Sequence, residues 1–97
     1  MHVTPHRDSV LVHLEGDLDL MTTGRVRRDL APFVDSAPSL VLDLADVVFI
    51  DSAGIGLLLS TRSSLLERGA TLEVRNPSSA VRQILDVTGL GGVLLET

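Results

Sequence analysis

A serine follows an aspartate at the point where one apolar run ends and the next begins. Residues 49–59 have the sequence FIDSAGIGLLL, which predicts the end of a buried strand, a tight corner and the start of a helix. Ser52 is a suitable N-cap residue, because its side-chain oxygen can accept hydrogen bonds from backbone amides that the first helical turn leaves unpaired. The hydroxyl is therefore expected at the amino end of a helix.

Capping alone would account for Ser52 and would contribute about 1 kcal/mol to stability. A second role, in binding or modification, is indicated by its neighbours. Asp51 adds a polar group at the same corner, and Ala53 is small. Gly54 and Gly56 are expected to let the backbone of a partner approach closely. Few bulky side chains would then shield the hydroxyl.

A serine hydrolase is the catalytic alternative. Its nucleophile elbow needs a glycine two residues before the serine, where this chain has Ile50. Only three histidines could act as the base, namely His2, His6 and His13. All three lie in the N-terminal segment, and an aspartate adjacent to the serine cannot easily orient a distant imidazole. Their spacing suits no metal site, and cysteine is absent. We expect no catalysis, metal or cofactor.

The composition predicts one compact domain over residues 1–97. The chain has 97 residues, of which 44% are hydrophobic, and a chain of this size can bury roughly two-thirds of its unfolded surface. The absence of cysteine suits a reducing cytoplasm. No signal peptide is visible at the start of the chain, and no apolar run reaches the ~18 residues of a membrane span. We expect a cytoplasmic protein without membrane contact.

The charge argues against nucleic acid as a direct partner. The formal net charge is −5, whereas phosphate neutralisation needs clustered cations. Arg25, Arg27 and Arg28 form the densest basic group, which is best interpreted as a solvated helix face. The aromatic residues are Phe33 and Phe49 alone, too few for a base-stacking surface.

The N-terminal half predicts two strands and a helix. Residues 1–8 are polar and predict a frayed or edge strand. Residues 10–15 alternate between apolar and polar, which predicts a strand with one buried face and with His13 on the other. A loop over residues 17–23 precedes a helix with Thr22 or Thr23 as its N-cap. The buried stripe of this helix is expected to contain Val26, Leu30, Phe33 and Val34.

Residues 40–44 are almost continuously apolar, which predicts a central strand covered on both faces. A turn or bulge at residues 45–46 then leads into the corner. In the helix after Ser52, Leu57 lies almost opposite the expected buried face, so it is either covered by a flanking element or an exposed contact for a partner. That buried face is expected to contain Ile55, Leu58, Leu59 and Leu66, with Leu65 at its edge.

The remaining chain predicts a strand at residues 70–75 and a helix. Gly69 suits the end of the preceding helix, Asn76 and Pro77 suit the N-cap and first position of the next one, and Gly89 suits its end. Residues 93–95 predict a last short strand or helix-edge segment. Alternating strands and helices favour an α/β fold with a largely parallel sheet. Loops that follow the strands then share the carboxyl edge of the sheet, where Asp19 and Ser52 are expected.

Nearly the whole chain, residues 9–95, resembles the STAS domain family, specifically the stand-alone anti-sigma factor antagonists. The matching stretches are LEGDLD at residues 14–19, LVLDL at 40–44, FIDSAGIG at 49–56, NPS at 76–78 with Val81 and Leu85, and TGL at 88–90. The resemblance implies a four- or five-stranded mixed sheet with helices packed mainly on one face. Two residues depart from the family pattern: Gly24 replaces a helix former, and Ala53 replaces a second serine.

The resemblance also implies a function without catalysis. The unphosphorylated protein would bind an anti-sigma factor and so free a sigma factor, and that partner, acting as a serine kinase, would phosphorylate Ser52 and end the binding. A cognate phosphatase would restore it. The expected partner-binding residues are Asp19, Thr22, Asp51, Ser52, Ala53, Gly54, Gly56 and Leu57. A different partner is the main alternative, with the chain as a STAS-like subunit of a lipid-transport ATPase or another signalling assembly.

Overall fold

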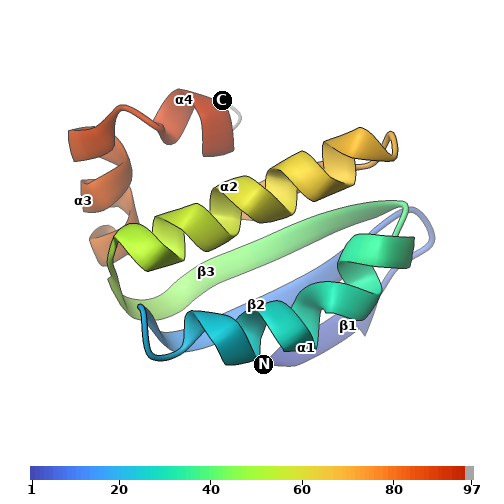
Figure 1. The fold of residues 1–97 in the computed structure, drawn as a ribbon, viewed down its shortest axis with the longest axis horizontal. Helices are drawn as coiled ribbons and strands as arrows, with labels where there is room; N and C mark the ends of the chain where they lie inside the picture. Colours follow the sequence, from blue (N-terminus) through green and yellow to red (C-terminus); the bar gives the residue numbers. More distant parts are fainter. Residues whose placement is uncertain (96–97) are drawn as a thin grey trace.

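The computed structural model describes residues 1–95, which form one sheet and a layer of helices (Figure 1). The elements in chain order are β1 (His2–Pro5), β2 (Val10–Leu18), α1 (Thr23–Ser36), β3 (Ser39–Ile50), α2 (Ser52–Glu67), β4 (Thr71–Arg75), α3 (Ser79–Thr88) and α4 (Gly91–Leu94). Residues 1–8, expected to be frayed or an edge strand, supply the edge strand β1. Among residues 1–95, no helix is long and apolar enough to cross a bilayer.

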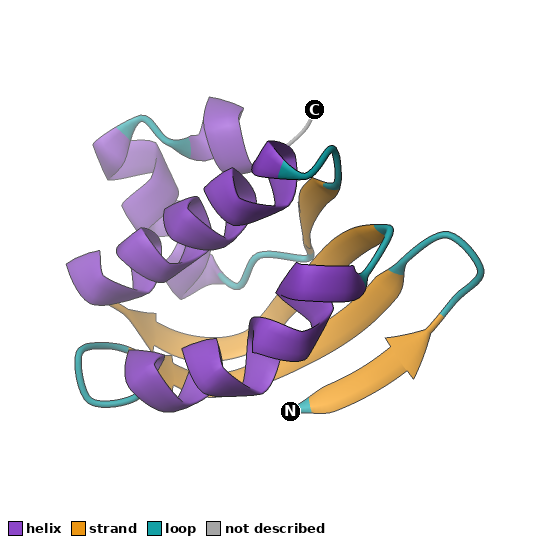
Figure 2. Cartoon of the chain, turned by 45° about the vertical axis from the view of Figure 1, so that its right-hand side comes forward, coloured by secondary structure: helices purple, strands orange, loops and turns teal. Residues whose placement is uncertain are grey.

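The strands of the described region lie in the order β1-β2-β3-β4. β1 pairs with β2 in antiparallel orientation, whereas β2 pairs with β3, and β3 with β4, in parallel. The helices lie mainly on one face of this sheet (Figure 2). The expected mixed α/β sheet, with four strands and helices mainly on one face, is therefore confirmed.

The strand β3 is central, but the prediction that both its faces are covered by other elements is wrong. Leu40, Leu42 and Leu44 point toward the helices and are fully buried. Within residues 1–95, the opposite face of the sheet has no helix above it (Figure 2). Val41 is nevertheless only 8% exposed, because it is flanked in register by Leu11 of β2 and a residue of β4. An apolar run in a central strand therefore needed only one covering layer.

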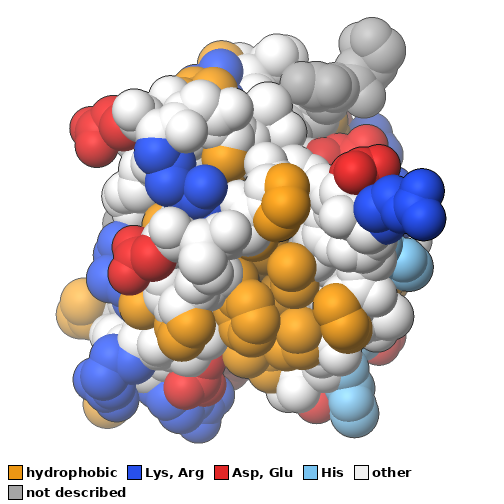
Figure 3. All heavy atoms as spheres, turned by 90° about the vertical axis from the view of Figure 1, so that its right-hand side faces the viewer, with side chains coloured by type: hydrophobic (Ala, Val, Ile, Leu, Met, Phe, Trp, Pro, Cys, Tyr) orange, Lys and Arg blue, Asp and Glu red, His pale blue; other side chains and the backbone are white. Residues whose placement is uncertain are grey.

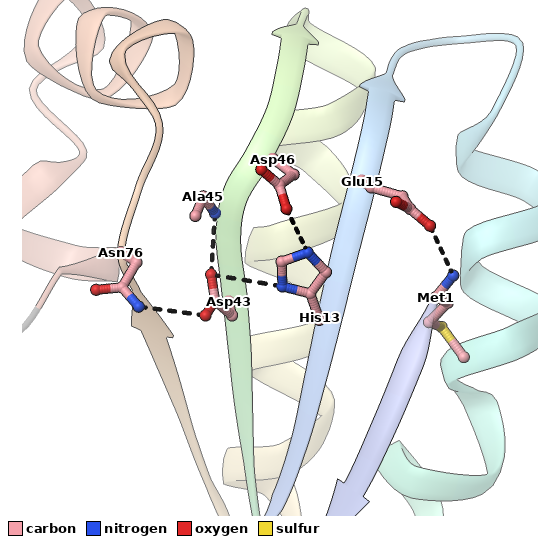
Figure 4. A network of polar contacts seen from close by, with 7 residues as sticks. All are labelled: Met1, His13, Glu15, Asp43, Ala45, Asp46 and Asn76. Carbon is pink, nitrogen blue, oxygen red and sulfur yellow. Dashed lines mark hydrogen bonds and ion pairs between the residues drawn. The ribbon is translucent and has the colours of Figure 1, made fainter.

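The uncovered face of the sheet carries a polar network centred on His13 (Figure 4). The Nε2 atom of His13 lies 2.7 Å from Oδ2 of Asp46, and Nδ1 lies 3.8 Å from Oδ1 of Asp43. Asp43 also accepts hydrogen bonds from the amide of Ala45 and from the side chain of Asn76. The predicted polar environment of His13 is confirmed. A register shift in the β2–β3 pairing occurs here, as the expected bulge at residues 45–46 implies.

The helix α2 is buried around more of its circumference than one apolar stripe predicts. Leu57, expected opposite the buried face, is fully buried, whereas Leu66, expected within it, is 47% exposed. Thr61 is buried as well. In Figure 1, α2 lies between α1 on one side and α3 with α4 on the other. A helix in the middle of its layer needs apolar residues on its flanks. Leu57 is therefore buried and Leu66 exposed, the opposite of what the single stripe predicts.

The helix α3 begins later than expected. Asn76 has a positive φ of 52°, and the N-cap is Ser78, whose Oγ accepts a hydrogen bond from the amide of Val81 at 3.2 Å. Asn76 is therefore not the cap. Gly69 and Gly89, with φ of 79° and 75°, follow the ends of α2 and α3 as predicted.

The last described element is helical. Residues 93–95 were expected as a short strand or helix-edge segment, and they form the end of the four-residue helix α4, with Leu95 as its C-cap, so the helix-edge alternative is confirmed. Leu94 is 2% exposed and belongs to the core. The strand alternative for this segment is therefore wrong, because Leu94 is buried within a turn of helix.

Candidate functional site

The corner between β3 and α2 is held by Asp51, not by Ser52. The side chain of Asp51 accepts hydrogen bonds at Oδ1 from the amides of Ala53 (2.9 Å) and Gly54 (3.1 Å). Asp51 is therefore the N-cap of α2, and the expectation that Ser52 caps this helix is wrong. The amide of Asp51 donates to the carbonyl of Leu18 at 3.2 Å, which keeps residue 51 extended and makes residue 52 the first helical residue.

Ser52 is consequently exposed at the amino end of α2. Among residues 1–95, the structure gives its hydroxyl no hydrogen-bond partner. Gly56, one helical turn further, is exposed, and a Cβ added there would have no atom within 4 Å. Ala53 is half-buried beside them. The residues around the hydroxyl therefore have small side chains or none, as the sequence predicted for this corner.

Gly54 has a different role from the one expected. It is buried, and a Cβ at this position would overlap the carbonyl oxygen of Leu18 and lie 2.7 Å from Cγ1 of Ile50. The absence of a side chain therefore allows α2 to pack closely against the ends of β2 and β3. The expectation that Gly54 admits the backbone of a partner is wrong, because the protein's own backbone fills that space.

The loop between β2 and α1 is folded by its own polar side chains. Oδ1 of Asp19 accepts from the amides of Met21 (2.9 Å) and Thr22 (3.1 Å). The hydroxyl of Thr22 accepts from the amide of Asp19 and donates to the carbonyl of Asp17 at 2.8 Å. Thr22 is the N-cap residue of α1, but its side chain makes no capping bond. Asp19 and Thr22 therefore fix the shape of the loop.

Asp51 also links this loop to the corner. Its Oδ2 accepts a hydrogen bond from the amide of Leu20 at 3.3 Å. The predicted meeting of the Asp19 loop and the Ser52 corner at the carboxyl edge of the sheet is confirmed, because Leu18 and Ile50, the last residues of their strands, are paired. In Figure 1, the loop, the start of α2 and α3 all lie at the left-hand end.

Large apolar side chains are exposed beside this corner. Leu20 and Met21 in the loop are 77% and 88% exposed, and Val48 and Phe49 near the end of β3 are 70% and 50% exposed. Sequence reasoning did not select any of them as site residues. For Leu20 and Met21 the signal was two apolar residues in an otherwise polar loop, and for Phe49 an apolar residue directly before the corner.

Of the eight residues predicted to bind a partner, the structure leaves six with some exposed surface. Ser52 and Gly56 are exposed, and the other four are half-buried, namely Asp19, Thr22, Asp51 and Ala53. Gly54 and Leu57 lie inside the protein. Leu57 is fully buried, so the alternative that it is an exposed contact is wrong, and a flanking element covers it.

The electrostatic surroundings of Ser52 are acidic. Asp51 precedes it directly, and Asp19 lies in the loop whose Leu20 amide is bonded to Asp51. Arg27 is directed to α2 further along, where its Nη1 donates to Oγ of Ser60 at 2.7 Å. An added negative charge at Ser52 would therefore lie next to the carboxylate of the preceding residue, Asp51.

The histidines lie far from Ser52. His13 is on β2, five residues before Leu18, which corresponds to about 16 Å along a strand. Leu18 is paired with Ile50 beside the corner, and His2 is paired with His13 at the distant position. His2 and His13, two of the three histidines considered as a general base for a hydrolase, therefore lie away from Ser52.

The fold and the corner together define the class of this protein. The chain belongs to the STAS domain family: the family model described as "Mlab, STAS domain" matches residues 1–96. The resemblance in the sequence is thus confirmed.

Among the relatives is the "Anti-sigma-B factor antagonist" of Bacillus subtilis (strain 168), which is 26% identical over 92 residues, covering 95% of this chain and 84% of the relative. The "Anti-sigma F factor antagonist" of Paenibacillus polymyxa is 30% identical over 87 residues, covering 88% and 74%.

Solved structures share the fold. The anti-sigma factor antagonist SpoIIAA in its unphosphorylated form has a TM-score of 0.80 at 24% identity, covering 97% of this chain and 84% of SpoIIAA. The phosphorylated form of SpoIIAA from Bacillus has a TM-score of 0.74 at 23% identity, covering 97% and 87%. At these identities the likeness establishes the fold, which is the one predicted.

Proposed function

We propose that this protein is an anti-sigma factor antagonist whose binding is switched by phosphorylation of Ser52. The observation that carries the proposal is the exposed Ser52 hydroxyl, which lies beside a capping carboxylate and among exposed apolar side chains. The names of the relatives support the partner, and the two forms of SpoIIAA support the modification. The function is binding by one domain spanning residues 1–97, without catalysis.

The unmodified surface suits a protein partner. Leu20, Met21 and Phe49 offer apolar area around the hydroxyl, and exposed apolar patches rimmed by polar residues are typical of protein interfaces. Ser52 and Gly56 leave the centre of this surface flat. An anti-sigma factor docked here would cover the hydroxyl and remove the surrounding apolar side chains from water.

Phosphorylation would reverse this complementarity. Transfer of the γ-phosphoryl group of ATP forms a bond to Oγ of Ser52, releases ADP and passes the hydroxyl proton to a base of the kinase. The product carries about −1.5 to −2 charges. The amides of Ala53 and Gly54, which could have bound it, already bond to Asp51. The phosphate would therefore be desolvated beside a carboxylate in the complex, which costs several kcal/mol.

The proposed partners follow from this cycle. The anti-sigma factor is itself the serine kinase, and a separate phosphatase returns Ser52 to its unmodified state by hydrolysis. A protein that controls the availability of a sigma factor works where transcription takes place, so we place it in the cytoplasm.

Calorimetry with the anti-sigma factor from the protein's own cells tests the proposal. Ser52→Ala should bind as tightly as the wild type, because the hydroxyl has no hydrogen-bond partner within the described residues 1–95. Ser52→Glu and the phosphorylated protein should bind at least 100-fold more weakly, equivalent to about 2.8 kcal/mol. Equal affinity of Ser52→Glu and the wild type would overturn the switch.

Isolation from the native cells provides two further readouts. Mass spectrometry should find a phosphoryl group, an added mass of about 80 Da, on residue 52. A tagged copy should recover a small ATP-binding protein. Recovery of a membrane ATPase in its place would favour the alternative of a transport-ATPase subunit.

A further inference from the structure

A groove lies between the end of β3 and α3. Its volume is about 360 Å³, and its lining residues are Phe49, Ile50, Ala80, Gln83, Ile84 and Val87. None of these six is charged, and the only polar side chain is the amide of Gln83. Val87 at its border is 81% exposed and Phe49 is 50% exposed. The protein thus presents an apolar groove to solvent at the same end as Ser52.

The β3 side of the groove lies within the radius of an interface centred on Ser52. A stable protein interface buries about 800 Å² on each partner, which corresponds to a disc of about 16 Å radius. Phe49 is three residues before Ser52, so the two Cα atoms are at most about 11 Å apart. An interface centred on the hydroxyl therefore includes at least the β3 wall of the groove.

The residues that line the groove indicate which kind of molecule would bind in it. A charged small molecule would find no opposite charge among the lining residues, and binding sites for small ligands combine an apolar lining with several convergent polar groups. Apolar side chains on a protein need no such groups. They bind by removing apolar surface from water on both partners.

We infer that this groove is a second docking point for the anti-sigma factor, which inserts uncharged apolar side chains between Phe49 and Val87. The inference rests on the proposed function and adds a contact that phosphorylation does not alter. The groove contributes to binding whether or not Ser52 is modified. The corner makes the overall affinity for the anti-sigma factor depend on the modification.

Two matched substitutions test the groove by calorimetry with the purified anti-sigma factor. Val87→Asp places a charge at the groove, and Leu66→Asp places the same charge elsewhere. Both residues are exposed and lie in the last turn of a helix, so the helix-dipole cost is alike. Leu66 is fourteen residues beyond Ser52, about 21 Å along α2, outside the expected interface. Val87→Asp should weaken binding at least tenfold, and Leu66→Asp less than twofold.

Thiol protection gives a readout independent of affinity. The chain has no cysteine, so Val87→Cys and Leu66→Cys each introduce a single thiol. Saturation with the anti-sigma factor should slow alkylation of residue 87 by iodoacetamide at least tenfold and leave residue 66 unchanged. Circular dichroism of each variant checks that the fold is retained.

The possible results separate the two proposals. If the partner binds in a manner sensitive to Ser52→Glu, but residue 87 stays reactive and Val87→Asp binds normally, the groove inference is wrong and the switch stands. If the wild type does not bind the anti-sigma factor, the proposed function fails and the groove inference fails with it. Loss of binding in Leu66→Asp equal to that in Val87→Asp would also contradict the groove.

Discussion

Asp51 and Leu20 are joined at the carboxyl edge of the sheet by a hydrogen bond of 3.3 Å between the Leu20 amide and Oδ2 of Asp51. The other oxygen of the same carboxylate accepts the amides of Ala53 and Gly54 at the start of α2. One side chain therefore fixes the position of the helix that begins at Ser52 relative to the loop beside it. The geometry of the proposed interface depends on this residue.

Removal of the carboxylate should weaken both connections. Asp51→Ala leaves the first amides of α2 without their acceptor, and loss of such a cap costs about 1 kcal/mol. Urea denaturation should show this decrease in the free energy of unfolding, and hydrogen exchange at the Leu20 amide should accelerate. Asp51→Asn separates the two connections: its oxygen can still cap α2, and asparagine caps helices about as well as aspartate, but its NH2 group cannot accept from the Leu20 amide. This variant should therefore keep the stability and still show faster exchange at Leu20. Unchanged stability and exchange in Asp51→Ala would contradict the capping role.

Two glycines of α2 offer a matched pair. Gly54→Ala would place a Cβ against the carbonyl of Leu18 and the side chain of Ile50, and such overpacking costs about 1–3 kcal/mol. Gly56→Ala meets open space and should stabilise the protein by about 0.5–1 kcal/mol through better helix propensity. Urea denaturation of both variants measures the difference. Equal effects of the two substitutions would show that Gly54 is not a packing position.

The leucines of α2 test the corrected burial. Leu57→Ala removes a fully buried side chain, which should cost about 2–5 kcal/mol through lost transfer energy and a cavity. Leu66→Ala alters a residue that is 47% exposed and should change stability by no more than about 0.5 kcal/mol. Thermal or urea unfolding distinguishes them. A smaller loss for Leu57→Ala than for Leu66→Ala would restore the single-stripe interpretation.

Much of the corner was predictable from local patterns. The apolar run before Asp51 and the helix-ending Gly69 and Gly89 each express a local rule, and the end of β3, the start of α2 and the ends of α2 and α3 lie where expected. The choice between Asp51 and Ser52 as the cap was not local. It depends on the hydrogen bond between the Asp51 amide and Leu18, a residue more than thirty positions earlier in the chain.

The other misses also arose from tertiary contacts. Leu57 is buried because α2 has neighbours on both flanks, which no helical wheel of α2 alone contains. Gly54 appeared available to a partner because the sequence does not reveal how closely β2 approaches it. The exposed apolar surface at the opposite end of the molecule from Ser52 (Figure 3) could not be predicted from the sequence either, because exposure depends on which elements pack together.

The exposed loop residues should affect binding without affecting folding. Leu20 and Met21 are 77% and 88% exposed, so the double substitution to serine should change the free energy of unfolding by no more than about 0.5 kcal/mol per residue. Apolar contacts at the centre of an interface can each contribute more than about 1 kcal/mol to binding. Calorimetry with the anti-sigma factor should therefore show at least a tenfold weaker complex, equivalent to about 1.4 kcal/mol.

A control for this prediction keeps the apolar character of the loop. Leu20→Met with Met21→Leu preserves apolar area, as volume-conserving exchanges do, and should bind within about threefold of the wild type, about 0.7 kcal/mol. If the serine double variant bound as tightly as the wild type, the interface would not include the loop. The hydrogen bond from Leu20 to Asp51 uses the backbone amide and survives every one of these substitutions, so any loss of affinity is attributable to the side chains.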